Sequence, residues 1–447
     1  MNRKITFINI FMILSLILSL CSFSSVNAQQ NVPPAPPSGG SQGGPGGNGI
    51  GPGGNGSQTE TPGNAANTIN TDSTVDSGTY ESTTSDENAL RIENKATATI
   101  TNATVNKSGD SSSTDNSNFY GLNAGILVRD GASAEIRNAS VTTNSSGSNG
   151  VFSYGTASVD ISDSKIRTSS NNSGGVEVAG GGTLTALNLD IETEGNSAAA
   201  IRSDRGGGTE SVTKGLYVTN GTGSPAVYCT ANITVNDATL KANSSEAVVI
   251  EGKNSVTLNN VDATGNMTGT YGGDQSENIH NVMIYQSMSG DASVGEGSFT
   301  MTDGSLTALS GDMFYITNTN AVISLTNVEL TLGNDTLLTI AGNDASRGWG
   351  TAGSNGGTAT FTADNQTMSG NITVDDISTL TLTMKNGTSY SGAINPDGQT
   401  KGTISVTIDS ASTWTLTGDS YVTEFNGNIS QVNANGHHLY VNGTAAD

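Results

Sequence analysis

The sequence predicts an all-β solenoid, a parallel β-helix, for most of the 447-residue chain. A pattern of apolar and small residues recurs from about residue 69 onward, with a usual step of about 25 residues. Within each repeat, single apolar residues alternate with Thr, Ser, Glu or Lys. No stretch of the repeat region shows a sustained period of 3.6 residues, so no α-helix is expected there.

The repeats keep their register when they are shifted onto one another. One inward position is predicted to hold Ile100, Ile136, Ile161 and Ala186, which are related by shifts of 36, 25 and 25 residues. A second column contains turn-forming residues and extends along the whole domain, which indicates about thirteen coils. Its predicted members are Ser77, Asn102, Asn138, Asp163, Asn188, Gly215, Asp237, Asn260, Asp303, Asn327, Asn365, Asn386 and about Gly418.

Each repeat is expected to contain roughly three strands. Every second residue is apolar in 96–101, and a period of two is typical of a strand with one buried face. One repeat cannot bury this face alone, but stacked repeats can, with equivalent strands about 4.8 Å apart. The turn column then lies at a corner, where Asn and Asp tolerate the left-handed conformation. Stacked Asn amides are expected to form a side-chain ladder between coils.

The N-terminus is expected to direct the protein out of the cell. Residues 1–28 have the features of a signal peptide, with basic Arg3 and Lys4, an apolar stretch, and a cleavage site after Ala28. Cys21 raises a lipoprotein alternative, in which Leu20 stands where a small residue is expected. The prediction is a secreted or cell-surface protein whose mature chain has no transmembrane segment.

Two further regions follow the signal peptide. Residues 29–64 are rich in Pro and Gly and are expected to form a disordered linker. Residues 65–447 are predicted to form the β-helix domain with a C-terminal cap.

Composition excludes several classes of function. The chain has 17 Lys and Arg against 40 Asp and Glu, a net charge of −23, so no basic surface for nucleic acid is expected. Three His and two Cys are too few for a Cys/His metal cluster or a disulfide scaffold.

The repeat columns across residues 69–440 resemble those of right-handed parallel β-helix proteins of the pectin-lyase-like and adhesin-like group. The segment 412–420 is also similar to the late coils of autotransporter passenger domains, although the sequence ends 27 residues later, without the membrane barrel that follows in those proteins. The resemblance implies a right-handed solenoid. It leaves open whether the protein is a polysaccharide lyase or hydrolase or a protein without enzymatic activity.

No catalytic residue is predicted. Asp375 and Asp376 are the only adjacent aspartates, and a turn explains them better than the carboxylate pair of a glycosidase. The tripeptide 70–72 looks like a pectinase motif, but its companion motifs do not accompany it, so we interpret it as chance.

Two other sets of reactive residues also have a structural interpretation. Arg202 and Arg205 flank Asp204 and precede three glycines, which favours a corner loop over a lyase site. Cys229 is in phase with the inward residues and is expected to be buried rather than nucleophilic.

Three insertions, at about 109–121, 265–281 and 342–357, are candidates for binding loops. The predicted ligand-binding residues are Phe119, Tyr120, Tyr271, Arg347 and Trp349, because aromatic rings on polar loops stack on sugars. Weak candidates for a metal, which would be calcium, are Asp274, Glu277 and Asp344. The alternative is that these loops pack back on the rod and shield strand edges.

The leading hypothesis is a secreted, non-enzymatic β-helix that acts as a surface adhesin or glycan-binding stalk, with an extracellular glycan or cell-surface component as its partner. No cofactor is certain. The alternatives are a carbohydrate-active enzyme and a structural surface-layer or matrix component. An ice-binding rod is not favoured, because Thr-X-Thr does not recur in the sequence at one fixed position of the coil.

Overall fold

The computed structural model describes residues 60–269, 278–287, 289–343, 350–398 and 402–446. All of them belong to the compact unit that comprises residues 40–447, which is distinct from residues 1–39. The predicted signal peptide, Cys21 and nearly all of the linker lie outside the described residues.

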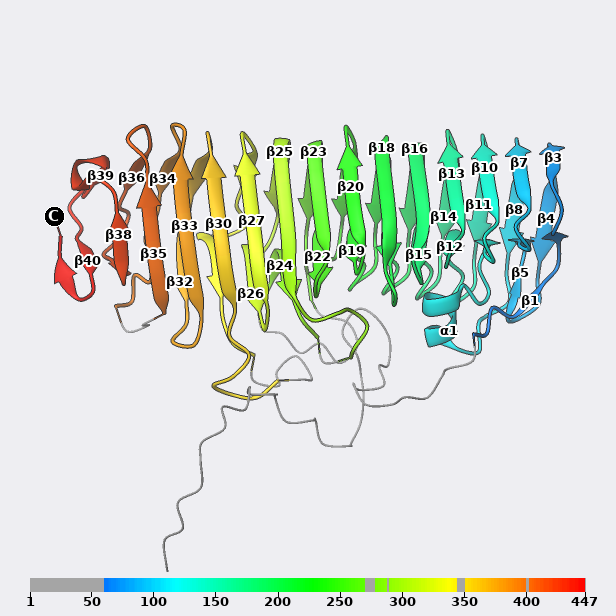
Figure 1. The fold of residues 1–447 in the computed structure, drawn as a ribbon, viewed down its shortest axis with the longest axis horizontal. Coiled ribbons are helices and arrows are strands. Elements are labelled where there is room, and N and C mark those ends of the chain that lie inside the picture. The colour runs from blue at the N-terminus through cyan, green and yellow to red at the C-terminus, as the bar shows by residue number, and fades with distance from the viewer. Residues whose placement is uncertain (1–59, 270–277, 288, 344–349, 399–401, 447) are drawn as a thin grey trace, which may run out of the picture. The chain divides into compact units, whose positions relative to one another are not determined.

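The described residues form a row of stacked parallel strands (Figure 1). A representative coil contains three strands, as predicted: β6 (Leu90–Ile92), β7 (Thr97–Thr101) and β8 (Thr104–Lys107). The first belongs to a 12-stranded sheet, and the other two belong to a 20-stranded sheet. In four coils the second and third strands continue through the corner as one long strand, in β16 (Gly182–Thr193), β18 (Gly208–Thr219), β23 (Ser255–Gly265) and β25 (Glu296–Ala308).

The 12-stranded sheet takes one strand from each of twelve coils, and a bridge between Ile372 and Ile394 adds a thirteenth coil. This agrees with the predicted number. The strands of this sheet are β2 (Thr68–Ile69), β6, β9 (Ile126–Val128), β12 (Val151–Tyr154), β15 (Val176–Ala179), β17 (Ile201–Ser203), β19 (Val227–Cys229), β22 (Val248–Glu251), β24 (His280–Tyr285), β26 (Asp312–Thr317), β29 (Thr336–Ile340) and β32 (Asn371–Val374).

The 20-stranded sheet forms the other two sides of the coil. Besides the strands already named, it contains β3 (Ser73–Asp76), β4 (Thr79–Ser82), β10 (Ser133–Arg137), β11 (Ser140–Thr143), β13 (Ser158–Ser162), β14 (Lys165–Thr168), β20 (Asn232–Asn236), β21 (Thr239–Ala242), β27 (Asn320–Thr326), β28 (Glu329–Thr331), β30 (Thr358–Asp364), β33 (Thr379–Lys385), β35 (Thr403–Ile408) and β38 (Glu424–Asn426).

Smaller sheets occur near the two ends of the described β-helix. Near its start, β1 (Asn64–Ala65) pairs with β5 (Glu87–Asn88). The later coils contain β31 (Thr367–Ser369), β34 (Ser389–Ser391), β36 (Thr413–Thr415) and β39 (Val432–Asn433), and the 3₁₀ turn η1 (Ile429–Gln431) precedes β39. The final sheet contains β37 (Ser420–Val422), β40 (Leu439–Val441) and β41 (Thr444–Ala445), and the last two strands pair antiparallel.

The predicted inward column is confirmed. Ile100, Ile136, Ile161 and Ala186 pair in register on successive strands, and each is at most 2% exposed. Burial of a large aliphatic side chain contributes roughly 1.5–3 kcal/mol, so a repeated column provides much of the stabilisation. The same column continues through Val212, Val235, Leu258, Met301, Leu325, Ala363, Met384 and Ile408.

The predicted turn column also lies at a corner with left-handed backbone. Its members from Ser77 to Asn386 have positive φ, as in Asn102 with φ of 56°. The expected ladder is present in a modified form, since Asn amides donate to Asp carboxylates of the preceding coil. The Nδ2–Oδ1 distance is 2.7 Å from Asn188 to Asp163 and 2.8 Å from Asn260 to Asp237.

The last member of that column was placed incorrectly. Gly418 is not among the residues with positive φ and lies just before β37. In the register of β33 and β35, Ser410 instead takes the position of Asn386, and Oδ2 of the neighbouring Asp409 accepts a hydrogen bond from the Asn386 backbone N–H at 2.7 Å. The late coils lack the regular turn residue, which explains why the sequence pattern drifted.

The expectation that the domain has no α-helix was wrong. The first insertion contains α1 (Thr114–Tyr120), in which Ser113 accepts a hydrogen bond from the Asn116 amide and Gly121 ends the helix with φ of 72°. A helix of seven residues makes barely two turns, so it produces no sustained period in the sequence.

The structure shows a column of Thr and Ser that the Thr-X-Thr sequences alone do not reveal. Nine successive coils place Thr or Ser at one outward position of the 20-stranded sheet. This central column contains Thr185, Ser211, Thr234, Thr257, Thr300, Ser324, Thr362, Thr383 and Thr407. Insertions of unequal length and the replacement of Thr by Ser hide this regularity in the sequence.

An acidic residue interrupts the core. Glu210 lies between Leu184 and Ile233 in an inward column and is fully buried. Neither of its carboxyl oxygens makes a hydrogen bond of normal geometry to the described residues. Burial raises the pKa of Glu210 well above its usual range, the nearby Glu177 adds to this, and the backbone of Val178 offsets only part of it.

Replacing this acid should stabilise the protein. We expect Glu210→Leu to raise the free energy of unfolding by roughly 1–3 kcal/mol at pH 7, because it removes an unsatisfied buried group and restores the aliphatic column. A raised folded-state pKa means that the contribution of Glu210 to stability is lost as the pH rises above its unfolded value. The gain from the substitution should therefore increase from pH 5 to pH 8 in denaturant titrations.

The half-buried, outward-facing Glu135 provides the control. Glu135→Leu should change the free energy of unfolding by less than about 0.5 kcal/mol. A Glu210→Leu protein that is less stable than the parent at pH 8 would contradict the burial of an unpaired acid.

Candidate functional site

The outer face of the 12-stranded sheet carries buried polar side chains. Glu177, Arg202 and Tyr228 occupy one outward column on β15, β17 and β19, and their exposed fractions are 0%, 2% and 3%. Outward side chains of a solenoid normally meet solvent, so this part of the sheet must be covered. Two insertions contact it through their described residues, one containing α1 and the other comprising residues 286–287 and 289–295.

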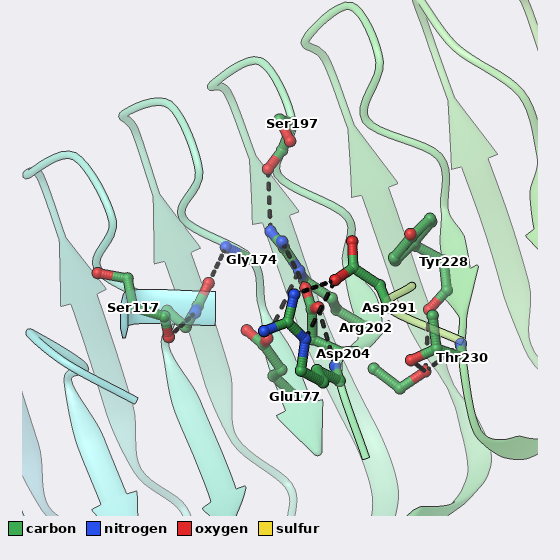
Figure 2. A network of polar contacts seen from close by, with 12 residues as sticks. Ser117, Gly174, Glu177, Ser197, Arg202, Asp204, Tyr228, Thr230 and Asp291 are labelled. Atoms are coloured by element: carbon green, nitrogen blue, oxygen red, sulfur yellow. Dashed lines mark hydrogen bonds and ion pairs between the residues drawn. The ribbon is translucent and has the colours of Figure 1, made fainter. Parts of the chain in front are cut away.

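Arg202 is the centre of the buried network (Figure 2). Its guanidinium lies 3.0 Å from Asp204 Oδ2 and 3.5 Å from Glu177 Oε1, and it donates to the Ser197 carbonyl at 3.1 Å. Burial raises the pKa of Asp204 to about 7, although Arg202 opposes this shift. Burial also raises the pKa of Glu177 well above its usual range. The network therefore contains two buried acids whose pKa values are raised by burial.

Arg205 connects the two covering insertions. Its Nη2 atom donates to Asp291 Oδ1 at 2.6 Å, and its guanidinium carbon lies 4.0 Å from the centre of the Phe119 ring. Asn149 fastens α1 to the sheet as well, since its amide bridges the Ser117 carbonyl and the Gly174 amide (Figure 2). The polar network is thus a clasp that holds both insertions against the sheet.

A second buried cluster lies farther along the same sheet face. His280 Nε2 lies 3.3 Å from Glu246 Oε1. Burial raises the pKa of Glu246, but His280 and the Ser245 hydroxyl outweigh this and hold it at about 2. In the neighbouring coil Asp312 accepts hydrogen bonds from Asn278, Asn334 and Thr339.

A third buried acid is surrounded by hydroxyl groups. Glu251 Oε2 accepts hydrogen bonds from the hydroxyls of Tyr228 at 2.8 Å and Tyr285 at 3.0 Å. Burial raises the pKa of Glu251, and the hydrogen bonds oppose this shift. Among the described residues, no three His, Cys, Asp or Glu side chains converge as metal ligands would.

The described part of the chain contains only two of the predicted ligand-binding residues. Phe119 is 1% exposed, so it packs back on the β-helix and has no free face for a sugar. Tyr120 is half-buried and meets Tyr154 edge to face, with 5.8 Å between ring centres. The other candidates, Tyr271, Arg347, Trp349, Asp274, Glu277 and Asp344, lie outside the described residues.

The structural interpretations of the aspartate pair and the cysteine are confirmed. Asp375 caps a turn, accepting hydrogen bonds from the Gly342 amide at 2.7 Å and the Ile377 amide at 3.3 Å. Cys229 is fully buried, and burial raises the pKa of its thiol to about 12. The Asp375 carboxylate and the Cys229 thiol therefore have structural roles.

The interpretation of Arg202 was wrong in part. Only Asp204 and Arg205 belong to the corner, whereas Arg202 lies within β17 as an outward member of the sheet. The sequence does contain a signal of the contact between Arg202 and Glu177, because the two residues occur at equivalent positions 25 residues apart. Opposite charges in one column of neighbouring coils indicate a pair between coils. The contribution of Asp291 has no such signal, since it comes from an insertion.

Two partly exposed tyrosine sites remain on the surface. The first, here called the tyrosine patch, consists of Tyr120, Tyr154, Arg129 and Glu60. The Tyr154 hydroxyl donates to Glu60 at 3.0 Å, and Arg129 lies 3.1 Å from the same carboxylate.

The second site lies in the last coils. There, Tyr421 and Tyr440 stack with 4.7 Å between ring centres and 6° between ring planes. Neither this pair nor Tyr154 lies in one of the three insertions, so no sequence pattern marked these residues as candidates.

Comparison with known proteins identifies the architecture. Residues 88–284 match the family model of the right-handed β-helix region. No curated protein and no solved structure matches the chain. The described residues form a parallel β-helix, and the match over residues 88–284 agrees with the right-handed fold that the resemblance implied. Within the described residues, no helix is long and apolar enough to cross a membrane.

Because Arg202 lies at the centre of the clasp, we expect its removal to lower the free energy of unfolding by an amount that depends on pH. We expect Arg202→Met to lower the free energy of unfolding by roughly 3–5 kcal/mol at pH 8, because it leaves buried Asp204 without its counterion. The pKa of Asp204 is raised in the folded state, so its contribution is favourable at low pH and is lost as the pH rises through about 7. The loss should consequently be smaller at pH 5.

Denaturant titrations at both pH values test this expectation. Combining Arg202→Met with Asp204→Asn should recover most of the stability at pH 8, because the second change removes the unpaired charge. Equal losses at the two pH values, without recovery in the double variant, would exclude the proposed network.

Proposed function

We propose that the protein is a secreted, non-enzymatic β-helix that acts at the cell surface as an adhesin or glycan-binding stalk. The observation that carries this proposal is the contrast between its acids and its tyrosines. The acids on the outer sheet face are buried, whereas the tyrosine patch and the Tyr421–Tyr440 pair remain partly exposed.

The tyrosine patch has the chemistry that sugar recognition requires. The half-buried ring of Tyr120 meets Tyr154 edge to face, Arg129 lies over the Tyr154 ring, and Glu60, which Tyr154 and Arg129 contact, offers an exposed acceptor. Stacking of a sugar ring with adjacent hydrogen bonds to its hydroxyls is a common basis of glycan binding. The β-helix supplies a rigid support, because Tyr154 lies on β12 and α1 is clasped to the sheet.

A carbohydrate-active enzyme is the second candidate. Asp204 and Glu177 have the raised pKa values that catalytic acids need, which favours this alternative. Against it, both side chains are at most 1% exposed and pair with Arg202, so a polysaccharide has no path to them without displacement of the insertions. We therefore assign them the structural role described above.

Secretion is part of the proposal and rests on the sequence of residues 1–28. N-terminal sequencing of exported protein should give a chain that begins at Gln29. A lipid-modified Cys21 at the mature terminus would place the protein on a membrane surface instead.

The glycan-binding proposal can be tested at the tyrosine patch. On a glycan array, the protein should bind at least one extracellular glycan, and Tyr120→Ala should weaken that binding roughly tenfold, because an aromatic contact contributes about 1.5 kcal/mol. Tyr120→Phe serves as the matched control, since it keeps the ring and should retain the affinity. Circular dichroism should show that both variants fold.

A parallel assay of polysaccharide degradation distinguishes the alternatives. Turnover of a pectin or glucan that is lost in Asp204→Asn would establish an enzyme. Absence of both turnover and glycan binding would favour a structural surface-layer or matrix component.

A further inference from the structure

The exposed side of the 20-stranded sheet carries a regular array of hydroxyl groups. It combines the central column defined above with a second column two residues earlier on each strand. The second column contains Thr183, Thr209, Asn232, Ser255, Ser298, Val322, Thr360, Thr381 and Ser405. Sixteen of the eighteen positions carry a hydroxyl; Asn232 and Val322 do not, and the Ser255 hydroxyl donates to Asn232. We call the two columns the hydroxyl array.

The array repeats in two directions. Neighbouring coils separate equivalent residues by about 4.8 Å, and two residues along a strand span roughly 6.7 Å. Nine coils at this spacing extend the array over about 38 Å along the axis. The strands that carry it lie side by side in Figure 1. Such a surface can match a ligand only if that ligand is itself periodic.

The hydroxyls of the central column are available to a ligand. Within the described residues, none of these nine side chains makes a hydrogen bond to another protein group, and all nine are half-buried or exposed. Each hydroxyl can therefore donate and accept outward. Seven of the nine are Thr, whose stiff β-branched side chain fixes the hydroxyl and the methyl group relative to the sheet.

The array is free of charge, although the whole chain carries −23. Charged side chains occupy the same outward positions only beyond its ends. The central column contains Glu135 and Asp160 in the two preceding coils, and Glu424 follows Ser405 in the next coil of the second column. This distribution is complementary to a neutral surface and would penalise a charged one.

The chemistry favours a lattice of water over a polysaccharide. Neither column contains an aromatic residue, so the array lacks the ring faces on which sugars stack. Ordered water offers donors and acceptors at every lattice point, and oxygen spacings in ice are close to both repeats of the array. Thr methyl groups between the hydroxyls limit competition from disordered solvent.

We propose that the hydroxyl array is an ice-binding surface. Thr and Ser hydroxyls hold water molecules in positions that continue into an ice face, and the methyl groups of Thr fill the spaces between them. The array lies on a different sheet from the strand that carries Tyr154 of the tyrosine patch. This inference therefore does not depend on glycan binding.

The test measures thermal hysteresis and partition of the purified chain into a growing ice shell. The unmodified protein should show hysteresis and enter the ice. Thr257→Lys combined with Thr300→Lys should abolish both, because two long charged side chains then protrude from adjacent coils at the centre of the array.

Thr307→Lys combined with Thr331→Lys is the matched control. These residues pair on adjacent coils of the same sheet but lie outside the array, so this variant should behave as the parent does. Thermal melting should be unchanged in both double variants.

Exclusion of the unmodified protein from ice, without hysteresis, would overturn the proposal. Equal loss in the array variant and the control would also overturn it, because the effect would not then belong to the array. Retention on microcrystalline cellulose in the absence of ice activity would assign the array to a polysaccharide instead. The result of the ice-binding test does not depend on whether the tyrosine patch binds a glycan.

Discussion

The parallel backbone pairing between equivalent residues of successive coils is the constraint on which the structure depends. Each strand finds its partners one coil before and one coil after, so a given position always meets the same position. A residue type that suits one coil must consequently suit its neighbours. This explains the aliphatic column through Ile136, the Asn and Asp corners with positive φ, and the outward hydroxyl column.

Because of the same constraint, a residue that does not suit its column lowers the stability of the protein and marks a special feature of the structure. A buried acid in an inward column, such as Glu210, disrupts contacts with two coils at once. On the 12-stranded sheet, the stacking of Glu177 next to Arg202 turns a column of outward side chains into an ion network once the insertions cover it. Buried ion pairs of this kind rarely add net stability over apolar residues. Their geometry does fix the insertions in one position, which a purely apolar contact would define less sharply.

Much of the fold could be predicted from the sequence because the repeat carries its own register. The alignment of Ile100 with Ile136 and Ile161, and the corners from Asn102 to Asn386, required only the period and the residue types. Features outside the period could not be found in this way. The short helix α1 has no partner in other coils, and Gly418 was misplaced where the corner residue changes to Ser410.

The candidate sites were less predictable than the fold. Sequence analysis directed attention to Tyr120 on an insertion, but the partners that complete the tyrosine patch come from other coils and from residue 60. The Arg205–Asp291 contact joins residues 86 positions apart through a loop of irregular length. The Glu177–Arg202 pair and the hydroxyl array do follow the period, but Ser, Asn and Val substitutions concealed the array until the strand register was known.

The central claim is that all coils stack in one continuous register along a single axis. Pulsed dipolar spectroscopy between spin labels at Thr185→Cys and Thr300→Cys, and between Thr185→Cys and Thr407→Cys, tests it most directly in a Cys229→Ala background. These pairs are four and eight coils apart in the central column, so the account predicts distances of about 19 Å and about 38 Å, before allowance for the linkers. A second distance that is not close to twice the first would contradict a continuous stack.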